Sequence, residues 1–276
     1  MIGNKHRPNN RRRLIVTADD FGLDKAVNEA VEQAWREGIL TAAGLMVGAP
    51  ATADAVEKAR RLDGLGIGLH LVLTDGEPVL PVEEVNLLTD SQGRFNDNMV
   101  AAGVRFFFDY RARRQLAAEI RAQFEAFRRT GLRLDHLSVH KHFHLHPTVL
   151  SLVMAIGREY GLKAVRLPRE APEPRALVPW LALMRLRLLR AGLRCNDQVF
   201  GLAHTGQMDE VRMVASISKI PYGITEIYCH PASRNDITPA MDGYLHTREL
   251  AALLSPRVAA AIDQADVEMI AFRDIA

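Results

Sequence analysis

Residues 14–22 read L-I-V-T-A-D-D-F-G, a short apolar run followed by two adjacent carboxylates, Asp19 and Asp20. The L-I-V run is typical of a buried strand, and the two aspartates stand where that strand is expected to end. Two neighbouring negative charges repel each other, so a bare pair would hold one of its two pKa values high. A bound cation would remove this repulsion, which makes the pair a candidate for a metal site.

Short β-branched runs alternate with helical patterns along the rest of the chain, which predicts an α/β protein with a parallel sheet. About seven such units in 276 residues favour an irregular (β/α) barrel of about seven parallel strands. An open doubly wound sheet is the second choice, because no Gly-rich nucleotide fingerprint follows any strand. The predicted strands are 13–18, 43–48, 66–73, 134–140, 163–168, 225–230 and 267–272, and the predicted helices are 24–38, 53–62, 110–130, 147–160, 177–191, 208–219 and 247–264.

A single domain is predicted over residues 13–276, preceded by a disordered basic tail over residues 1–12. Two excursions interrupt the strand–helix rhythm, near residues 74–100 and 169–207, and long loops in barrels commonly hold substrate. Within the second excursion, residues 177–190 repeat apolar side chains at helical spacing with arginines between them. An ordinary covering helix is the first interpretation, and a lid or membrane-contacting helix is the alternative.

The composition limits which kinds of partner and which cellular compartment are expected. Lys and Arg number 35 against 33 Asp and Glu, a net charge of +2, so nothing indicates a nucleic-acid partner. Cys195 and Cys229 stand far apart and outside any C-x-x-C pattern, which is typical of a reducing compartment. No apolar run approaches the ~20 residues that span a bilayer. We expect a cytoplasmic protein. Peripheral membrane contact through residues 177–190 and assembly as a homodimer are two further possibilities.

Titratable side chains stand at the ends of four predicted strands, where the active sites of parallel barrels lie. Asp19 and Asp20 end the first strand, and His70, His140 and His230 end or nearly end three others. An Asp-Asp pair on its own more often forms a turn or caps a helix than binds a metal. A lone histidine near a strand end is more often a hydrogen-bonded structural residue than a functional one. Together they converge on one end of one architecture, and one Asp with two His forms an open coordination set for a divalent ion.

The alternation of side chains along a strand suggests how these groups point. Residues i and i+2 share a face, so Ala18 and Asp20 lie together while Asp19 takes the other face or the turn. Ser138 and His140 share a face in the same way. If these even-numbered faces point into the barrel, Asp20 and His140 both aim at its mouth.

Four motifs then occur in order along the chain, and through them it resembles the YdjC-like carbohydrate deacetylases, relatives of the polysaccharide deacetylases. The similarity runs over about residues 14–272, and the spacing resembles the hopanoid-biosynthesis-associated branch, which is implicated in deacetylating an N-acetylglucosaminyl lipid. The resemblance implies a polysaccharide-deacetylase-like barrel that hydrolyses an N-acetyl group on an amino sugar or glycolipid, giving acetate and a free amine. The motifs are T-A-D-D-F-G, G-L-H-L-V-L, V-H-K-H-F-H-L-H-P and E-I-Y-C-H-P.

The resemblance also implies roles for residues that match the family's motifs. Asp20, His70 and His140 match its metal ligands, Asp19 matches its base, and His230 matches a histidine that is a candidate general acid. Two imidazoles favour Zn²⁺ or another transition ion over Mg²⁺ as the one divalent ion. The candidate substrate-binding residues are Arg166, His142, His144 and Glu226.

The chain departs from the family pattern at one motif and leaves alternatives open. Where the family often reads D-S-H-H-H-V-H, this chain reads S-V-H-K-H-F-H, so Ser138 and Lys141 replace an Asp and a His. The alternatives are a deacetylase of chitobiose-type oligosaccharides, another metal-dependent hydrolase or phosphatase, and a non-catalytic sugar-binding protein. An acid at His230 favours amide hydrolysis, and the presence of both Asp19 and His230 argues against binding alone.

Overall fold

The computed structural model describes residues 11–275, so most of the tail predicted over residues 1–12 lies outside the described residues. Strand β1 already begins at Arg12, inside that predicted tail. The strands are β1 (Arg12–Phe21), β2 (Ala42–Leu45), β3 (Gly66–Leu71), β4 (Leu137–Val139), β5 (Gln198–Phe200), β6 (Gly223–Cys229) and β7 (Val267–Met269). The helices are α1 (Lys25–Glu37), α2 (Thr52–Ala59), α3 (Met99–Phe108), α4 (Tyr110–Arg129), α5 (Pro147–Glu159), α6 (Val178–Arg190), α7 (Glu210–Ile217), α8 (His246–Leu253) and α9 (Pro256–Gln264).

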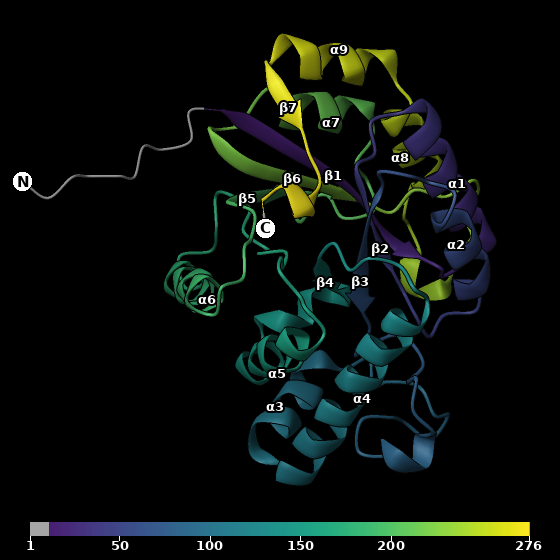
Figure 1. The fold of residues 1–276 in the computed structure, drawn as a ribbon, viewed down its shortest axis with the longest axis vertical. Helices are drawn as coiled ribbons and strands as arrows, with labels where there is room; N and C mark the ends of the chain where they lie inside the picture. The colour runs from purple at the N-terminus through teal and green to yellow at the C-terminus, as the bar shows by residue number, and fades with distance from the viewer. Residues whose placement is uncertain (1–10, 276) are drawn as a thin grey trace, which may run out of the picture.

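The strands form one parallel sheet in the order β4-β3-β2-β1-β6-β5, with β7 beside β1. The central strand β1 pairs with β6 from Arg12 to Ala18, the longest pairing of the sheet. Helices α3, α4 and α5 lie together beyond β3 and β4, whereas α1, α7, α8 and α9 lie around β1, β6 and β7 (Figure 1). The strands therefore run through the middle of the molecule, and their carboxyl ends meet inside it.

The predicted irregular barrel of about seven parallel strands is not complete, and the sheet is instead a curled half-barrel. The predicted strand 163–168 forms only isolated bridges, at Ala164 and Val165. The peptide of Leu167 bonds to a side chain, because its N–H donates to Asn196 Oδ1 at 2.7 Å and its carbonyl accepts from Asn196 Nδ2 at 2.8 Å. A side-chain amide thus replaces the next ladder partner and ends the pairing there.

Several other elements differ from the prediction. The helix expected over 247–264 is two helices, α8 and α9, because Pro256 lacks the N–H that would continue the first and Ser255 caps the second. Helix α3 and strand β5 were not predicted, and lie at or within the expected excursions. The expected helix 177–191 forms as α6. Within residues 11–275, no helix combines the length and the hydropathy required to cross a bilayer.

The interior of the half-barrel is lined by the odd-numbered residues of β1, opposite to the expected face. Ile15 packs in a small cluster with Phe272, and Thr17 donates from Oγ1 to Glu226 Oε1 on the neighbouring strand β6 at 2.7 Å. The even-numbered residues Leu14, Val16 and Ala18 belong to the large core that includes the apolar face of α1. Asp19, in phase with Thr17, therefore faces the interior directly.

Candidate metal and catalytic site

The site begins at the end of β1, where both aspartates reach the interior. Asp20 has a φ of +64°, a left-handed conformation that non-glycine residues seldom adopt. The register between β1 and β2 also shifts between Ala18 and Phe21. Together these irregularities break the strand alternation, so Asp20 approaches the same space as Asp19 from a face that regular geometry would turn away.

Asp20, His70 and His140 form a cluster of three buried groups with the donor types of a divalent-ion site. Asp20 Oδ1 lies 3.2 Å from His70 Nε2 and 3.2 Å from His140 Nδ1, and neither carboxylate oxygen of Asp20 has a hydrogen-bond partner. Burial opposes ionisation, but the two imidazoles hold the pKa of Asp20 well below its usual value. A buried, ionised carboxylate without hydrogen bonds is costly unless a cation neutralises it, so these donors fit such an ion.

Ser138 supports this cluster from the same face of β4. Its Oγ lies 2.8 Å from His70 Nδ1, and in the tautomer whose Nδ1–H donates to this hydroxyl, Nε2 carries a lone pair on the side of Asp20. Ser138, at the position where the sequence departs from the expected motif, thus contacts a ring nitrogen of the cluster.

Asp19 is held by a different partner, the guanidinium of Arg166. Arg166 Nη1 and Nη2 donate to the two carboxylate oxygens at 2.6 and 2.9 Å, and Arg166 also donates to Glu226 Oε1 at 2.7 and 2.9 Å. Burial alone would raise the pKa of Asp19, but the charge of Arg166 and its hydrogen bonds lower it below the ordinary range. Asp19 is thus an ionised carboxylate, 3.7 Å from His70 Nδ1.

His230 faces Asp20 from the end of β6, with its Nε2 3.9 Å from Asp20 Oδ2. Two side chains of α8 hold its peptide. Its N–H donates to Glu249 Oε2 at 2.5 Å, and its carbonyl accepts from His246 Nδ1 at 2.5 Å. Burial lowers the pKa of His230, although the nearby carboxylates of Asp20 and Asp19 act in the opposite direction.

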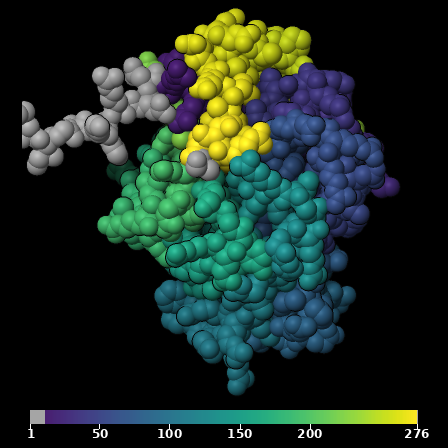
Figure 2. Space-filling view, in the orientation of Figure 1, coloured from purple at the N-terminus to yellow at the C-terminus, as the bar shows by residue number. Residues whose placement is uncertain are grey.

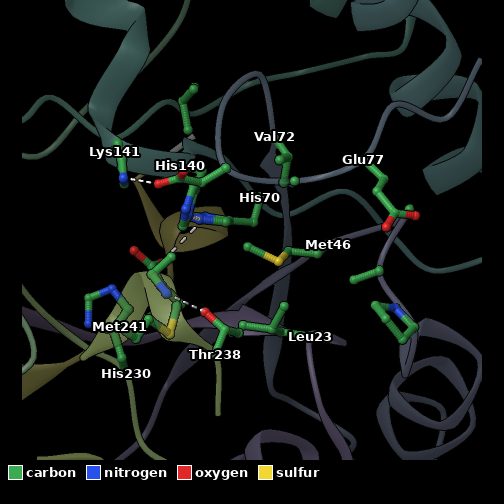
Figure 3. A pocket seen from close by; sticks show the side chains of 18 of the residues that line it. Leu23, Met46, His70, Val72, Glu77, His140, Lys141, His230, Thr238 and Met241 are labelled. Atoms are coloured by element: carbon green, nitrogen blue, oxygen red, sulfur yellow. Dashed lines mark hydrogen bonds and ion pairs between the residues drawn. The ribbon is translucent and has the colours of Figure 1, made fainter. Parts of the chain in front are cut away.

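A cavity of about 590 Å³ lies over these groups. Its polar lining near the cluster includes Asp19, His70, His140 and His230, together with His142, Thr205, Tyr228 and Tyr244. Its other polar and charged lining residues are Asp75, Glu77, Arg94, Gln123, Lys141 and Thr238. Its apolar part contains Leu23, Met46, Val72, Val79 and Met241. In Figure 3, His70 and His140 meet at the centre, with Val72, Met46 and Leu23 on one side and His230 and Met241 on the other.

The side chains of residues 140–146 point to different parts of the site. The segment forms the 3-10 helix η2 (His140–Leu145), in which Lys141 and His142 both adopt left-handed φ angles, +51° and +53°. This strained turn separates the rings. His142 lines the cavity, whereas His144 is fully buried and donates from Nε2 to the carbonyl of Arg166 at 2.8 Å. Lys141 forms an ion pair with Asp75 at the cavity wall.

Not every residue expected to bind substrate reaches the cavity. His142 lies at its wall, but Arg166, Glu226 and His144 have no exposed surface and do not line it. The structure places these three beneath the site, where Arg166 joins Asp19 to Glu226 and His144 supports the Arg166 backbone.

Two tyrosines and a threonine of the cavity were missed by the sequence analysis. The hydroxyl of Tyr228 lies 2.8 Å from Thr205 Oγ1 and 3.3 Å from His142 Nε2. Strand alternation was a usable signal for Tyr228, because it precedes His230 by two residues on the same face of β6. Thr205 and Tyr244 lie in irregular segments and carry no such signal.

Comparison with known proteins places the chain in a family. The model of the YdjC-like protein family matches residues 13–264. The chain is 31% identical to a carbohydrate deacetylase of Brevibacillus brevis, over 95% of this chain and 99% of that one, and 30% identical to a carbohydrate deacetylase of Vibrio vulnificus, over 95% and 96%. A solved structure from Enterococcus faecalis V583, provisionally described as a cellobiose-phosphate cleavage protein, superposes with a TM-score of 0.81 at 26% identity, over 96% of this chain and 99% of that one. This chain belongs to the YdjC-like protein family.

Proposed function

We propose that this protein is a metal-dependent hydrolase that removes the N-acetyl group from an acetylated amino sugar, releasing acetate and a free amine. One observation carries the proposal: the buried carboxylate of Asp20 faces His70 and His140 without a hydrogen-bond partner, and the ionised carboxylate of Asp19 lies beside it. The relatives named carbohydrate deacetylase support the choice of a sugar and of an acetyl group.

Asp20, His70 and His140 would hold the ion, and two imidazoles with one carboxylate favour Zn²⁺ or another transition ion over Mg²⁺. Such an ion, when bound, polarises a carbonyl and lowers the pKa of water. Ser138 fixes the tautomer of His70 that leaves Nε2 free for this role. The proton transfers of the reaction are carried out by side chains of the protein.

Asp19 and His230 divide the proton transfers of the hydrolysis between them. Asp19, kept ionised and oriented by Arg166, accepts the proton of the attacking water. The amine nitrogen leaves poorly until it is protonated, so the reaction needs an acid within reach of that nitrogen. His230 donates this proton from its imidazolium form, which the carboxylates of Asp20 and Asp19 favour and burial opposes. Glu249 and His246 hold its backbone in place.

The cavity wall favours a substrate with an apolar portion. Leu23, Met46 and Val79 offer no hydrogen bonds to sugar hydroxyls, whereas His142 and Tyr228 lie among the polar groups near the ion site. We extend the proposal to an amino sugar linked to a lipid, such as an N-acetylglucosaminyl hopanoid, and chitobiose-type oligosaccharides are the alternative. A substrate panel with matched glycolipids and chitobiose, compared by kcat/KM, separates the two.

The proposed function is tested by acetate release from N-acetylglucosamine conjugates, with and without a chelator. We expect the chelator to abolish release and Zn²⁺ to restore it. Asp20→Ala should lose both bound metal and turnover. Asp19→Asn should keep the metal, measured by elemental analysis of the purified protein, and lower kcat by about a hundredfold or more.

Metal content in Asp20→Ala equal to that of the wild type would remove the assignment of the ion site. Phosphate release from sugar phosphates, without acetate release, would favour a phosphatase instead. Binding of the amino sugar without any turnover, in the metal-loaded protein, would favour a sugar-binding protein.

A further inference from the structure

Helix α3 and the residues after it expose an unusual concentration of large apolar side chains. Val104, Phe107, Phe108 and Tyr110 are 56%, 50%, 77% and 68% exposed, and Val100 at the start of the helix is 79% exposed. Phe107 and Phe108 also contact each other, with ring centroids 5.0 Å apart. Soluble proteins seldom gather this much apolar surface unless it contacts a partner or a membrane.

Helix α6 has a second outward apolar strip. Its inner face buries Leu181, Met184 and Leu188 against the core, which accounts for only part of its apolar residues. The outer face leaves four further aliphatic side chains between 40% and 45% exposed, namely Val178, Leu183, Leu186 and Leu189.

The two helices lie close together on one part of the molecule. Trp180 of α6 donates from Nε1 to the carbonyl of Leu145 at 2.8 Å, and the next residue, His146, stacks edge-on against Phe107 of α3 with ring centroids 6.3 Å apart. Figures 1 and 2 show α6 and α3 on the surface on either side of α5. We call the exposed faces of α3 and α6, with the arginines around them, the α3–α6 surface.

Positive charge is concentrated on the α3–α6 surface. Residues 174–196 contain five arginines and no acidic residue, although the whole chain carries a net charge of only +2. Within the part of the chain that the structure describes, only Arg185 of these five forms an ion pair, with Asp197. In and next to α3 and α6, within residues 105–114 and 175–194, eight arginines form no ion pair with a described residue, namely Arg105, Arg111, Arg113, Arg114, Arg175, Arg187, Arg190 and Arg194.

We propose that the α3–α6 surface docks on an anionic membrane. Exposed aromatic and aliphatic side chains enter the boundary between headgroups and acyl chains, while arginines around them pair with lipid phosphates. A second copy of this chain fits the surface less well. In a symmetric dimer the same arginines would face each other, and this repulsion opposes association.

The test is co-sedimentation of the full-length protein with vesicles of phosphatidylcholine alone or mixed with phosphatidylglycerol. We expect binding to the anionic vesicles only, and less binding in high salt. Phe108→Asp and Leu186→Asp should each weaken binding by about tenfold or more, because each puts a negative charge into the docking face. Val211→Asp is the matched control, because Val211 is 72% exposed on α7, and it should bind like the wild type.

Equal binding to neutral and anionic vesicles, no binding to either, or unchanged binding by Phe108→Asp and Leu186→Asp would each overturn the proposal. A dimer in light scattering that both variants dissociate would assign the surface to a second copy instead. Acetate release from a water-soluble substrate is measured in parallel, so that a failure of membrane docking can be distinguished from a failure of the proposed function. Phe108 and Leu186 do not line the cavity, so both variants should hydrolyse the water-soluble substrate at the wild-type rate. This activity also shows that the variants are folded.

Discussion

Asp19 and Asp20 are adjacent in the chain, yet their charges are balanced by different partners. Arg166 pairs with Asp19 through two hydrogen bonds, whereas Asp20 has only imidazole nitrogens around its oxygens. The left-handed φ of Asp20 makes this division possible, because it brings the second carboxylate to the same space from another direction. One aspartate is thereby neutralised within the protein, and the other is left for an added cation.

The buried His144 makes the stability of the protein depend on pH. Burial lowers the pKa of His144 from 6.5 to about 4, so the ring is neutral in the folded protein but gains a proton in the unfolded chain below pH 6.5. Its contribution to stability is therefore present above pH 6.5 and is lost as the pH falls toward 4. We expect the free energy of unfolding to fall by about 1.4 kcal/mol per pH unit in this window from this group alone.

Urea unfolding of the wild type and His144→Gln, at pH 7 and at pH 5, measures this contribution. Glutamine keeps an N–H donor for the carbonyl of Arg166 but does not titrate. The variant should lose about 2 kcal/mol less than the wild type between the two pH values. An equal loss in both proteins would show that His144 is not the titrating group.

The sequence predicted which side chains meet at the site better than it predicted how they arrive there. Asp20, His70, His140 and His230 end strands of one parallel sheet, and that alone brings them to one edge. Their directions depend on backbone angles, such as the φ of Asp20, that no residue pattern reveals. The burial of Arg166 was also hidden, because an arginine near a site is as readily a substrate contact as an internal counter-ion.

Among the secondary-structure elements, α4 has a direct effect on the shape of the cavity. Glu119 accepts the backbone N–H groups of Val79 and Leu80 at 2.9 and 3.1 Å, and Gln123 exchanges two hydrogen bonds with the peptide of Val72. The segment from Val72 to Val79 forms much of the cavity wall. A buried helix face therefore holds a loop that has no regular structure of its own.

Replacing Glu119 by Leu should loosen this wall, because two peptide N–H groups lose their acceptor. We expect KM for the amino-sugar substrate to rise by about tenfold with a much smaller change in kcat, since no proton-transferring group moves. Glu125→Leu is the control on the same helix, because Glu125 pairs with Arg128 and Arg129 on the surface. A fall in kcat with unchanged KM would contradict a role in shaping the wall.

The elements that the sequence missed share a physical cause. Helix α3 reads M-V-A-A-G-V-R-F-F-F and is apolar on several sides, so it lacks the two-sided pattern of a covering helix. Strand β5 has only three residues, too few for any periodicity. The predicted strand 163–168 has the right composition, but its partner at Leu167 is a side chain far along the chain. A local sequence pattern does not reveal that a distant side chain takes the place of a strand as the hydrogen-bond partner.

At the scale of the whole molecule, the half-barrel is closed at the end opposite the site by the segment after β7. Phe272 is fully buried there and stacks on His136 with ring centroids 4.4 Å apart. The next residue, Arg273, donates its backbone N–H to Asp135 Oδ1 at 3.0 Å. The small cluster at this end contains Ile15, Ala42, Ala164, Ile270 and Phe272.

Phe272→Ala should lower the free energy of unfolding by about 3–5 kcal/mol, because it leaves a cavity beneath the sheet. The metal content of the folded protein should not change, since the ion site lies at the other end of the strands. Urea denaturation and elemental analysis measure the two quantities. Phe108→Ala, at a residue 77% exposed, should stay within about 0.5 kcal/mol of the wild type, and equal destabilisation of both would refute the assignment.

The pairing of β1 with β6 and β7 also has a consequence in time. The first residues of β1 pair with Gly223 at the start of β6 and with Val267 at the start of β7, both far later in the chain. A ribosome that adds about 5–20 residues per second takes on the order of 10–50 s to reach β7 after β1. For most of that interval the central strand lacks two of its three neighbours, so the nascent chain is expected to engage chaperones before the site can form.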